Sequence, residues 1–366
     1  MSDVLTDPRP ETAAETATKV VDCDIHPSFR TPTEILDYLP SRWRDHARAF
    51  GIRPPNSMTG ALAYPRMGGG MRQDAWPPTG GPPASDLEFM RAQHLDPLNI
   101  EVGILHCLNP GPSLMDLDFS AAYCAAMNDW QVDRWLSQEP RLRGTIVIPQ
   151  EDTAAAVAEI EARATDPRFV QVAFVPRGIE PSGRRRYWPI YEAAAKHGLP
   201  VAMHTAPYGW RENTGAGNAS FYLEEHYAVA NPIQSAMTSL IFEGVFERLP
   251  NLKLVLVEGG FAWAAPLMWR MDREWARMRD EIPAVRRAPS DYVRRQVWLT
   301  TQPVEEPPRN ADLKHLIRWL GADRIMFSSD YPHWDFDDPH RAFRIGLKPE
   351  EKSAILRDNA RAVYGF

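Results

Sequence analysis

The stretch Val20-Val21-Asp22-Cys23-Asp24-Ile25-His26-Pro27 runs from apolar residues directly into an Asp-x-His pair. A short apolar run of this kind is typical of a parallel strand that is buried on both faces. Successive side chains of a strand point to opposite faces, so Asp24 and His26 project from the same face. We therefore expect this strand to end in two metal ligands, provided that later strands end in matching ones.

Seven further apolar segments follow this stretch, and helical segments separate them. The predicted strands are 20–24, 102–106, 142–148, 170–174, 201–204, 252–257, 297–300 and 324–327. Eight short strands that alternate with helices predict an α/β fold, a (β/α)8 TIM barrel. A doubly wound open sheet is the alternative, but no Gly-x-Gly-x-x-Gly motif follows an early strand.

Two long segments rich in proline and glycine interrupt this pattern. They are residues 31–86 after the first strand, with one short helix predicted near 32–39, and residues 205–222 after the fifth. Long loops inside a compact domain are commonly functional. A single helix is predicted over 223–246. Residues 1–19 have no periodic apolar face and are predicted to be a disordered tail, which leaves 20–366 as one barrel domain.

Composition and charge exclude several classes of protein. A formal net charge of -7 argues against nucleic acid or an anionic membrane as the main partner. No apolar run is long enough for a transmembrane helix, and the N-terminus lacks the apolar core of a signal peptide. Three cysteines without Cys-x-x-Cys spacing do not form a disulfide framework. We therefore expect a cytoplasmic protein that binds neither nucleic acid nor membranes.

Acidic and histidine residues gather at the carboxyl ends of the predicted strands, where (β/α)8 barrels have their active sites. They are Asp24 and His26 on the first strand, His106 on the second, His204 on the fifth, Glu258 on the sixth and Asp330 on the eighth. Imidazole and carboxylate ligands without thiolates suit Zn, Mn or Fe. Such a metal would activate a bound water or polarise a substrate carbonyl or carboxylate. Asp330 is placed to act as a general base beside it.

Further residues near these strand ends complete the candidate site. His226 begins the helix after the second insertion and would make six ligands with Asp24, His26, His204, Glu258 and Asp330. Asp330, Glu258 and His226 are also the candidate acid–base residues. Asp22 lies one pleat deeper, so we expect it to orient the ligands rather than to bind metal. For His106 and His333, a structural role is favoured over one in the pocket.

The ligand pattern resembles that of the amidohydrolase superfamily, and four later motifs sharpen the resemblance. They are Phe242-Glu-Gly-Val-Phe-Glu-Arg-Leu-Pro-Asn-Leu-Lys, Val257-Glu-Gly-Gly-Phe-Ala-Trp, Gly321-Ala-Asp-Arg-Ile-Met-Phe-Ser-Ser-Asp-Tyr-Pro-His and Asn359-Ala-Arg-Ala-Val-Tyr-Gly. These motifs are similar to the branch that includes the aminocarboxymuconate-semialdehyde and resorcylate decarboxylases. The resemblance implies a TIM barrel with one or two divalent metal ions, a small acid or aromatic acid as substrate, and a homodimer or higher oligomer.

Two residues depart from the pattern of that branch. Asp24 stands where many members have a histidine, and Glu258 stands where the decarboxylases have their catalytic histidine. The leading hypothesis is a metal-dependent hydrolase or lyase, decarboxylase-like, acting on a small carboxylic-acid or amide-type substrate. Six ligands with three carboxylates would also suit two metal ions, so the second hypothesis is a dinuclear non-haem Fe or Mn oxygenase. A third is a non-catalytic subunit in a hetero-oligomer with an active paralogue.

Overall fold

The computed structural model describes residues 18–52, 70–205, 208–211, 214–215, 217, 219–342 and 345–366. Residues 1–17 of the predicted tail, and residues 53–69 of the segment that follows the first strand, lie outside the described residues.

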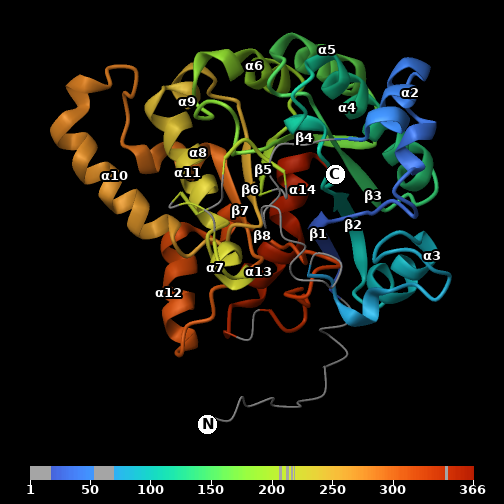
Figure 1. The fold of residues 1–366 in the computed structure, drawn as a ribbon. Helices are drawn as coiled ribbons and strands as arrows, with labels where there is room; N and C mark the ends of the chain where they lie inside the picture. Colours follow the sequence, from blue (N-terminus) through green and yellow to red (C-terminus); the bar gives the residue numbers. More distant parts are fainter. Residues whose placement is uncertain are drawn as a thin grey trace.

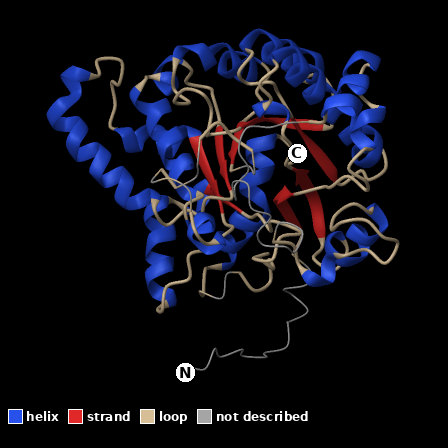
Figure 2. Ribbon diagram, in the orientation of Figure 1, coloured by secondary structure: helices blue, strands red, loops and turns tan. Residues whose placement is uncertain are grey.

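Eight parallel strands form the centre of the molecule, and helices surround them (Figures 1 and 2). The strands are β1 (Val20–Ile25), β2 (Ile100–Leu105), β3 (Leu142–Ile146), β4 (Phe169–Phe174), β5 (Val201–His204), β6 (Leu254–Val257), β7 (Val297–Thr300) and β8 (Ile325–Met326). Each pairs with the next in chain order. The Cys23 amide donates to the Phe327 carbonyl (3.0 Å), and Ile25 forms a parallel bridge with Tyr331. These contacts bring β8 back to β1, and the predicted TIM barrel is confirmed.

Helices follow most of the strands, as the sequence predicts. The α-helices are α2 (Ser41–Phe50), α3 (Leu87–Met90), α4 (Leu117–Gln131), α5 (Thr153–Arg163), α6 (Trp188–Lys196), α7 (Tyr222–Tyr227), α8 (Ala230–Phe242), α9 (Val245–Arg248), α10 (Ala264–Met278), α11 (Pro289–Gln296), α12 (Asn310–Leu320), α13 (Pro349–Ser353) and α14 (Asn359–Tyr364). Short 3-10 helices are η1 (Glu34–Asp37), η2 (Gln73–Ala75), η4 (Gly111–Ser113), η6 (Arg185–Tyr187), η7 (Arg279–Glu281) and η8 (Ala322–Arg324), and π-helical turns are η3 (Arg91–Leu95), η5 (Val132–Leu136) and η9 (Ala354–Asp358). In the described part of the chain, no helix is both long and apolar enough to cross a membrane.

Helix α14 covers the amino-terminal end of the barrel. Its Ala360 and Val363 pack into the apolar cluster that β-strand side chains form inside the barrel. Lys253, which precedes β6, donates from Nζ to the Val363 carbonyl (2.6 Å). Because this end is filled by apolar packing, the polar residues of the strands are left to the opposite, carboxyl end.

Two helical predictions were wrong. The helix predicted over 223–246 is divided into α7, α8 and α9. Pro232 lies in the first turn of α8, where proline is tolerated. Because proline has no N–H and its ring clashes with the preceding turn, it disfavours a helix that runs on from α7 into α8. Gly244 has φ +78° and separates α8 from α9. Helix α2 was not predicted, although Trp43 and Ala47 are buried at the i, i+4 spacing of an amphipathic helix.

Candidate metal centre

Four buried side chains converge at the carboxyl end of the barrel. Asp24 and His26 come from β1, His204 ends β5, and Glu258 follows β6. His204 Nε2 lies 3.3 Å from Asp24 Oδ2 and 3.0 Å from Glu258 Oε2. One ligand atom from each of the four residues lies within 4.8 Å of the others, so the group can hold a metal ion.

A second group of possible ligands adjoins the first and shares His26 with it. It consists of His26, Asp330 and His333, again with ligand atoms within 4.8 Å of one another. His26 Nε2 lies 2.9 Å from Asp330 Oδ1, and His333 Nδ1 lies 2.5 Å from the same oxygen. The structure thus brings five of the six sequence-predicted ligands together and adds His333, for which the sequence favours a structural role.

The donor atoms of this centre suit a divalent metal ion. Asp24 Oδ1 and Oδ2, His26 Nε2 and His204 Nε2 are buried and have no hydrogen-bond partner among the described residues. The other nitrogen of each ring is held by a backbone carbonyl, His26 Nδ1 by His106 (2.9 Å) and His204 Nδ1 by Thr205. A proton on Nδ1 leaves the Nε2 lone pair free to bind metal, as in many metalloproteins. The residues therefore fit a metal of the Zn, Mn or Fe class.

The electrostatics of the centre favour a cation. Burial opposes the charged form of Asp24, but His26 and His204 hold the pKa of its carboxyl well below its usual range. Burial likewise opposes protonation of His204, yet Asp24 and Glu258 raise its pKa to about 10. Burial and the neighbouring Asp330 raise the pKa of Glu258. Without a metal, protons screen the crowded carboxylates, and a bound metal would displace them.

Two of the acidic residues in these groups lie on strained backbone. Glu258 has φ 53° and Asp330 has φ 63°, values in the left-handed region that side-chain-bearing residues rarely adopt. The Asp330 amide donates to the Asp24 carbonyl (3.2 Å), and the Glu258 amide donates to Thr300 Oγ1 (3.3 Å). Such strain, held by surrounding contacts, is common at functional sites. Here the strained residues, Glu258 and Asp330, directly follow or lie just beyond the ends of β6 and β8, at the barrel mouth.

Asp22 lies behind the candidate ligands, one pleat deeper in β1. Its carboxylate accepts from the Ser329 amide (2.9 Å), Ser329 Oγ (2.6 Å), His94 Nε2 (2.8 Å) and the Asp24 amide (3.1 Å). Asp22 is fully buried and belongs to neither ligand group. It therefore fixes the residue before Asp330 relative to β1.

A chain of polar contacts leads from Asp330 to His226. Gln302 Nε2 donates to Asp330 Oδ2 (3.1 Å) and to Asp335 Oδ2 (2.9 Å). Asp335 Oδ2 in turn lies 3.2 Å from His226 Nε2. Burial lowers the pKa of His226, but the hydrogen bond to Asp335 and the nearby charges of Asp335, Glu258 and Asp330 together raise it above its usual value. His226 lies outside both ligand groups.

His106 is a buried structural histidine. Its Nε2 lies 2.6 Å from Gln171 Nε2, and its ring stacks on His204 with centroids 5.1 Å apart. Burial lowers the pKa of His106 to about 3, so the ring is neutral. Tyr364 of α14 donates to Gln171 Oε1 (2.8 Å), which ties this packing to the closed end of the barrel.

Sequence reasoning missed Gln302 and Asp335, and it ranked His333 low. All three lie in loops beyond strand ends, and Gln302 carries no charge that would mark it as a candidate. The sequence signal for His333 and Asp335 is their spacing, because they follow the candidate ligand Asp330 by only three and five residues.

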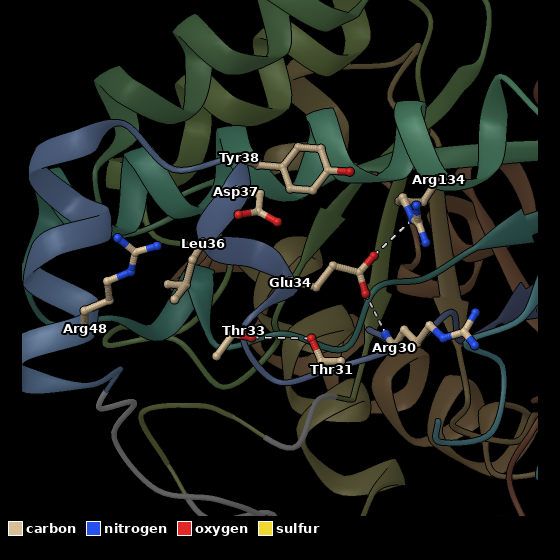
Figure 3. A pocket seen from close by; sticks show the side chains of 9 residues that line it. All are labelled: Arg30, Thr31, Thr33, Glu34, Leu36, Asp37, Tyr38, Arg48 and Arg134. Carbon is tan, nitrogen blue, oxygen red and sulfur yellow. Dashed lines mark hydrogen bonds and ion pairs between the residues drawn. The ribbon is translucent and has the colours of Figure 1, made fainter. Parts of the chain in front are cut away.

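A surface pocket beside η1 is separate from this centre (Figure 3). None of its nine lining residues belongs to either ligand group. Its Glu34 pairs with Arg134 (3.0 Å) and accepts from the Arg30 amide (2.6 Å).

Comparison with known proteins agrees with this geometry. The amidohydrolase family model matches residues 21–366. A gamma-resorcylate decarboxylase from Polaromonas sp. is 26% identical over 294 residues, which are 76% of this chain and 87% of the relative. A solved amidohydrolase from Mycobacterium avium subsp. paratuberculosis superposes with a TM-score of 0.72 at 21% identity, covering 96% of this chain and 98% of the other.

A second solved structure has a metal bound. The dihydroxybenzoic acid decarboxylase from Polaromonas sp., with manganese and the inhibitor 2-nitroresorcinol, superposes with a TM-score of 0.67 at 21% identity, covering 95% of this chain and 97% of the other. The family match spans nearly the whole chain, and the fold and the buried ligand cluster are consistent with it. This chain is therefore an enzyme of the amidohydrolase family, on the branch that contains the resorcylate decarboxylases.

Proposed function

We propose that this enzyme is a metal-dependent decarboxylase of a small aromatic carboxylic acid. The observation that carries the proposal is the buried cluster of Asp24, His26, His204 and Glu258 at the carboxyl end of the barrel, with Asp330 Oδ1 2.9 Å from His26 Nε2. The decarboxylase names of its relatives supply the reaction class.

The metal has a defined place in this proposal. Asp24, His26, His204 and Asp330 would hold it, with Glu258 as a further ligand within reach. When bound, it would orient and polarise a substrate carboxylate or an adjacent hydroxyl group.

The protein's own residues account for the proton. In decarboxylation the bond between the ring carbon and the carboxyl carbon breaks, CO₂ leaves, and the ring carbon keeps the electron pair and takes up one proton. We assign that proton to His226, because its pKa is raised and it lies at the end of a polar chain that begins at Asp330. Gln302 keeps Asp335 and Asp330 in fixed positions, and Asp335 orients the His226 ring and stabilises its charge.

The test is release of CO₂ from hydroxylated benzoic acids by protein stripped of metal and then loaded with Mn, Zn or Fe. Amide substrates in the same panel test hydrolysis, the other reaction in the leading hypothesis. We expect CO₂ from at least one aromatic acid only in the loaded protein, and none from His204→Ala, which loses a central ligand. His197→Ala is the matched control, because His197 pairs with Glu161 on the barrel exterior (2.9 Å). If the fully loaded enzyme releases no CO₂ from any aromatic acid, the proposal fails.

A second candidate, an Fe or Mn oxygenase, is favoured by one observation. Glu258 brings a third carboxylate into the ligand cluster, in addition to Asp24 and Asp330. Carboxylates and imidazoles with open positions suit iron that reacts with oxygen. Dioxygen uptake by iron-loaded protein in the presence of the same acids would support this function, and uptake equal to that of His204→Ala would exclude it.

A further inference from the structure

We propose that the Tyr222 hydroxyl donates a hydrogen bond to the carboxylate of the acid substrate, and that the Trp334 indole orients this hydroxyl. The inference rests on the proposed function only for the acidic nature of the substrate and does not depend on the reaction that follows. It gives a binding role to the first residue of α7, which neither the metal centre nor the proton transfer uses.

Tyr222 lies on the face of α7 that turns toward the barrel mouth. Tyr222 and His226 are four residues apart and therefore share one side of the helix. Their rings stack, with centroids 5.6 Å apart and 28° between the planes. On the other side of α7, Leu223 is 52% exposed and Tyr227 is 77% exposed. The phenol of Tyr222 is thus held beside the side chain to which we assign the proton.

Trp334 fixes the direction of the hydroxyl. Its Nε1 donates to Tyr222 Oη (2.9 Å). An indole N–H can only donate, so the Tyr222 oxygen is the acceptor in this bond and its own hydrogen must point elsewhere. Within the described residues, Trp334 is the only hydrogen-bond partner of Tyr222 Oη. The phenolic hydrogen is therefore available to an acceptor on a bound molecule.

The acids of the metal centre are near this phenol. Asp335, Glu258 and Asp330 are close enough for their charges to act on it. Burial, together with these charges, raises the pKa of Tyr222 to about 12, although the bond from Trp334 lowers it. The hydroxyl therefore keeps its proton at neutral pH. A neutral donor adds no negative charge to a site that admits an anionic substrate.

Three segments of the chain hold this hydroxyl in place. Tyr222 comes from the end of the insertion after β5, Trp334 from the loop after β8, and Gly70 from the insertion after β1. The Trp334 amide donates to the Gly70 carbonyl (2.7 Å), which fixes the indole at its backbone. A donor that is fixed before the ligand arrives loses little freedom on binding, so more of the hydrogen-bond energy appears as affinity.

An aromatic carboxylate is the ligand that fits these surroundings. A hydrogen bond to a charged acceptor is roughly twice as strong as one between neutral groups. A carboxylate has two oxygens, so one can accept from the phenol while the other remains free for the metal centre. The Trp334 ring lies 5.5 Å from the His226 ring, centroid to centroid, so Tyr222, His226 and Trp334 form an aromatic wall. The ring of an aromatic acid can pack against such a wall.

Calorimetric titration of the Mn-loaded protein with benzoate tests this inference and requires no turnover. We expect Tyr222→Phe to bind benzoate about 10- to 100-fold more weakly than the wild type, the usual loss for a hydrogen bond to a charged group. The variant keeps the ring that packs on His226, and unchanged Mn content and Tm would show that it is folded and loaded. Tyr227→Phe is the matched control, because it makes the same change at an exposed position of the same helix. It should bind benzoate as the wild type does.

Trp334→Phe tests the orienting role, because phenylalanine keeps an aromatic ring but has no N–H. It should weaken benzoate binding less than Tyr222→Phe does, and the double variant should lose no more than Tyr222→Phe alone, since both changes act on one hydrogen bond. If Tyr222→Phe folds poorly, weaker benzoate binding by Trp334→Phe carries the test.

Three results would overturn the inference: no benzoate binding by the wild type, equal affinity in the wild type and Tyr222→Phe, or losses that add fully in the double variant. Weaker benzoate binding by Tyr222→Phe, without CO₂ release from any aromatic acid, would uphold the binding role of Tyr222 and remove only the proposed reaction.

Discussion

Asp22 is a buried residue that contacts both sides of the candidate metal centre without belonging to either ligand group. Its carboxylate links the β1 backbone to Ser329, directly before Asp330, and also holds His94. The Asp-x-Asp-x-His order places three polar side chains on one face of β1, with Asp22 deepest. Position on the strand therefore separates the acid that lies in the candidate ligand group, Asp24, from the acid that lies behind it, Asp22.

Asp22→Asn should destabilise the protein by about 3 kcal/mol, because the amide cannot accept all of these bonds and leaves buried donors unsatisfied. Urea unfolding measures this loss, and titration with Mn should show weaker binding as Asp330 loses its support. Ser329→Ala is the control, since it removes one hydroxyl but keeps the backbone donor, and about 1–2 kcal/mol is expected. Equal losses in the two variants would contradict the role given to Asp22.

The charge on His226 predicts a pH dependence. As proton donor His226 must be protonated, so kcat/KM should fall as pH rises through its pKa. Burial lowers this pKa, but Asp335 and the other nearby carboxylates together raise it by more, which places the fall above the usual range of a histidine. Asp335→Asn removes the raising partner and should move the fall to lower pH.

His226→Gln should lower kcat by about 100-fold or more, the usual contribution of a general acid, and should abolish the fall at high pH. The pH profile separates this role from a structural one, which would lower activity equally at all pH values. A fall that stays in place in both His226→Gln and Asp335→Asn would assign the proton to another group.

Looking for acidic and histidine residues at the ends of predicted strands identifies the candidate ligands on regular strands more clearly than those held by loops. Asp24 and His204 lie within strands and His26 directly follows β1, so their direction follows from the alternation of side chains. Asp330 and His333 reach the centre through a turn that returns to β1. No periodic sequence pattern encodes the path of such a turn. The position of His333 therefore could not be predicted as firmly as the positions of the residues on strands.

At the scale of elements, the segments after β1 and β5 meet over the barrel mouth. The Trp334 amide donates to the Gly70 carbonyl (2.7 Å), and Trp334 Nε1 donates to Tyr222 Oη (2.9 Å). Met71 pairs with His333 in an antiparallel bridge. His226 of α7 stacks on Tyr222 with centroids 5.6 Å apart. Both insertions thus support the loop that carries His333 and Asp335.

Gly70→Ala tests this contact. Gly70 has φ +85°, and a Cβ there would lie 2.8 Å from Tyr222 Oη and 2.9 Å from Trp334 Cδ1. We expect displacement of both aromatic side chains, a several-fold rise in KM and a loss of stability of about 2 kcal/mol from strain and crowding together.

Gly80→Ala is a close match, because Gly80 also has φ +85° but nothing within 4 Å of the added Cβ. It should lose about 1 kcal/mol of stability through strain alone and leave KM unchanged. If both variants have the same KM, contact between the two insertions does not shape the site.

The sequence predicts whether a segment is a helix or a strand more reliably than it predicts where a helix is interrupted. Strands β5 and β7 have the predicted bounds because apolar runs mark buried strands clearly. The helix predicted over 223–246 failed because its apolar spacing continues through two breaks. Tertiary packing decides where such an amphipathic segment is interrupted, and Pro232 and Gly244 only permit the breaks.

At the scale of the whole molecule, barrel closure creates the centre. The ligands come from β1, β5, β6 and the loop after β8, and Asp24 and Asp330 are 306 positions apart in the sequence, since 330 − 24 = 306. Only the return of β8 to β1 brings these two residues together. A bound metal would therefore act as a cross-link between the first and last parts of the chain.

This cross-link predicts that metal removal destabilises the whole barrel. An ion that binds the folded but not the unfolded chain adds about 4 kcal/mol when present at 1,000 times its dissociation constant. For a chain of this size, chelation should lower Tm by on the order of 5 °C, and Mn should restore it. His204→Ala should melt at one temperature with or without chelator, whereas His226→Ala should respond like the wild type, because His226 lies outside both ligand groups. An unchanged wild-type Tm after verified metal removal would mean that hydrogen bonds such as the one from the Cys23 amide to the Phe327 carbonyl close the barrel by themselves.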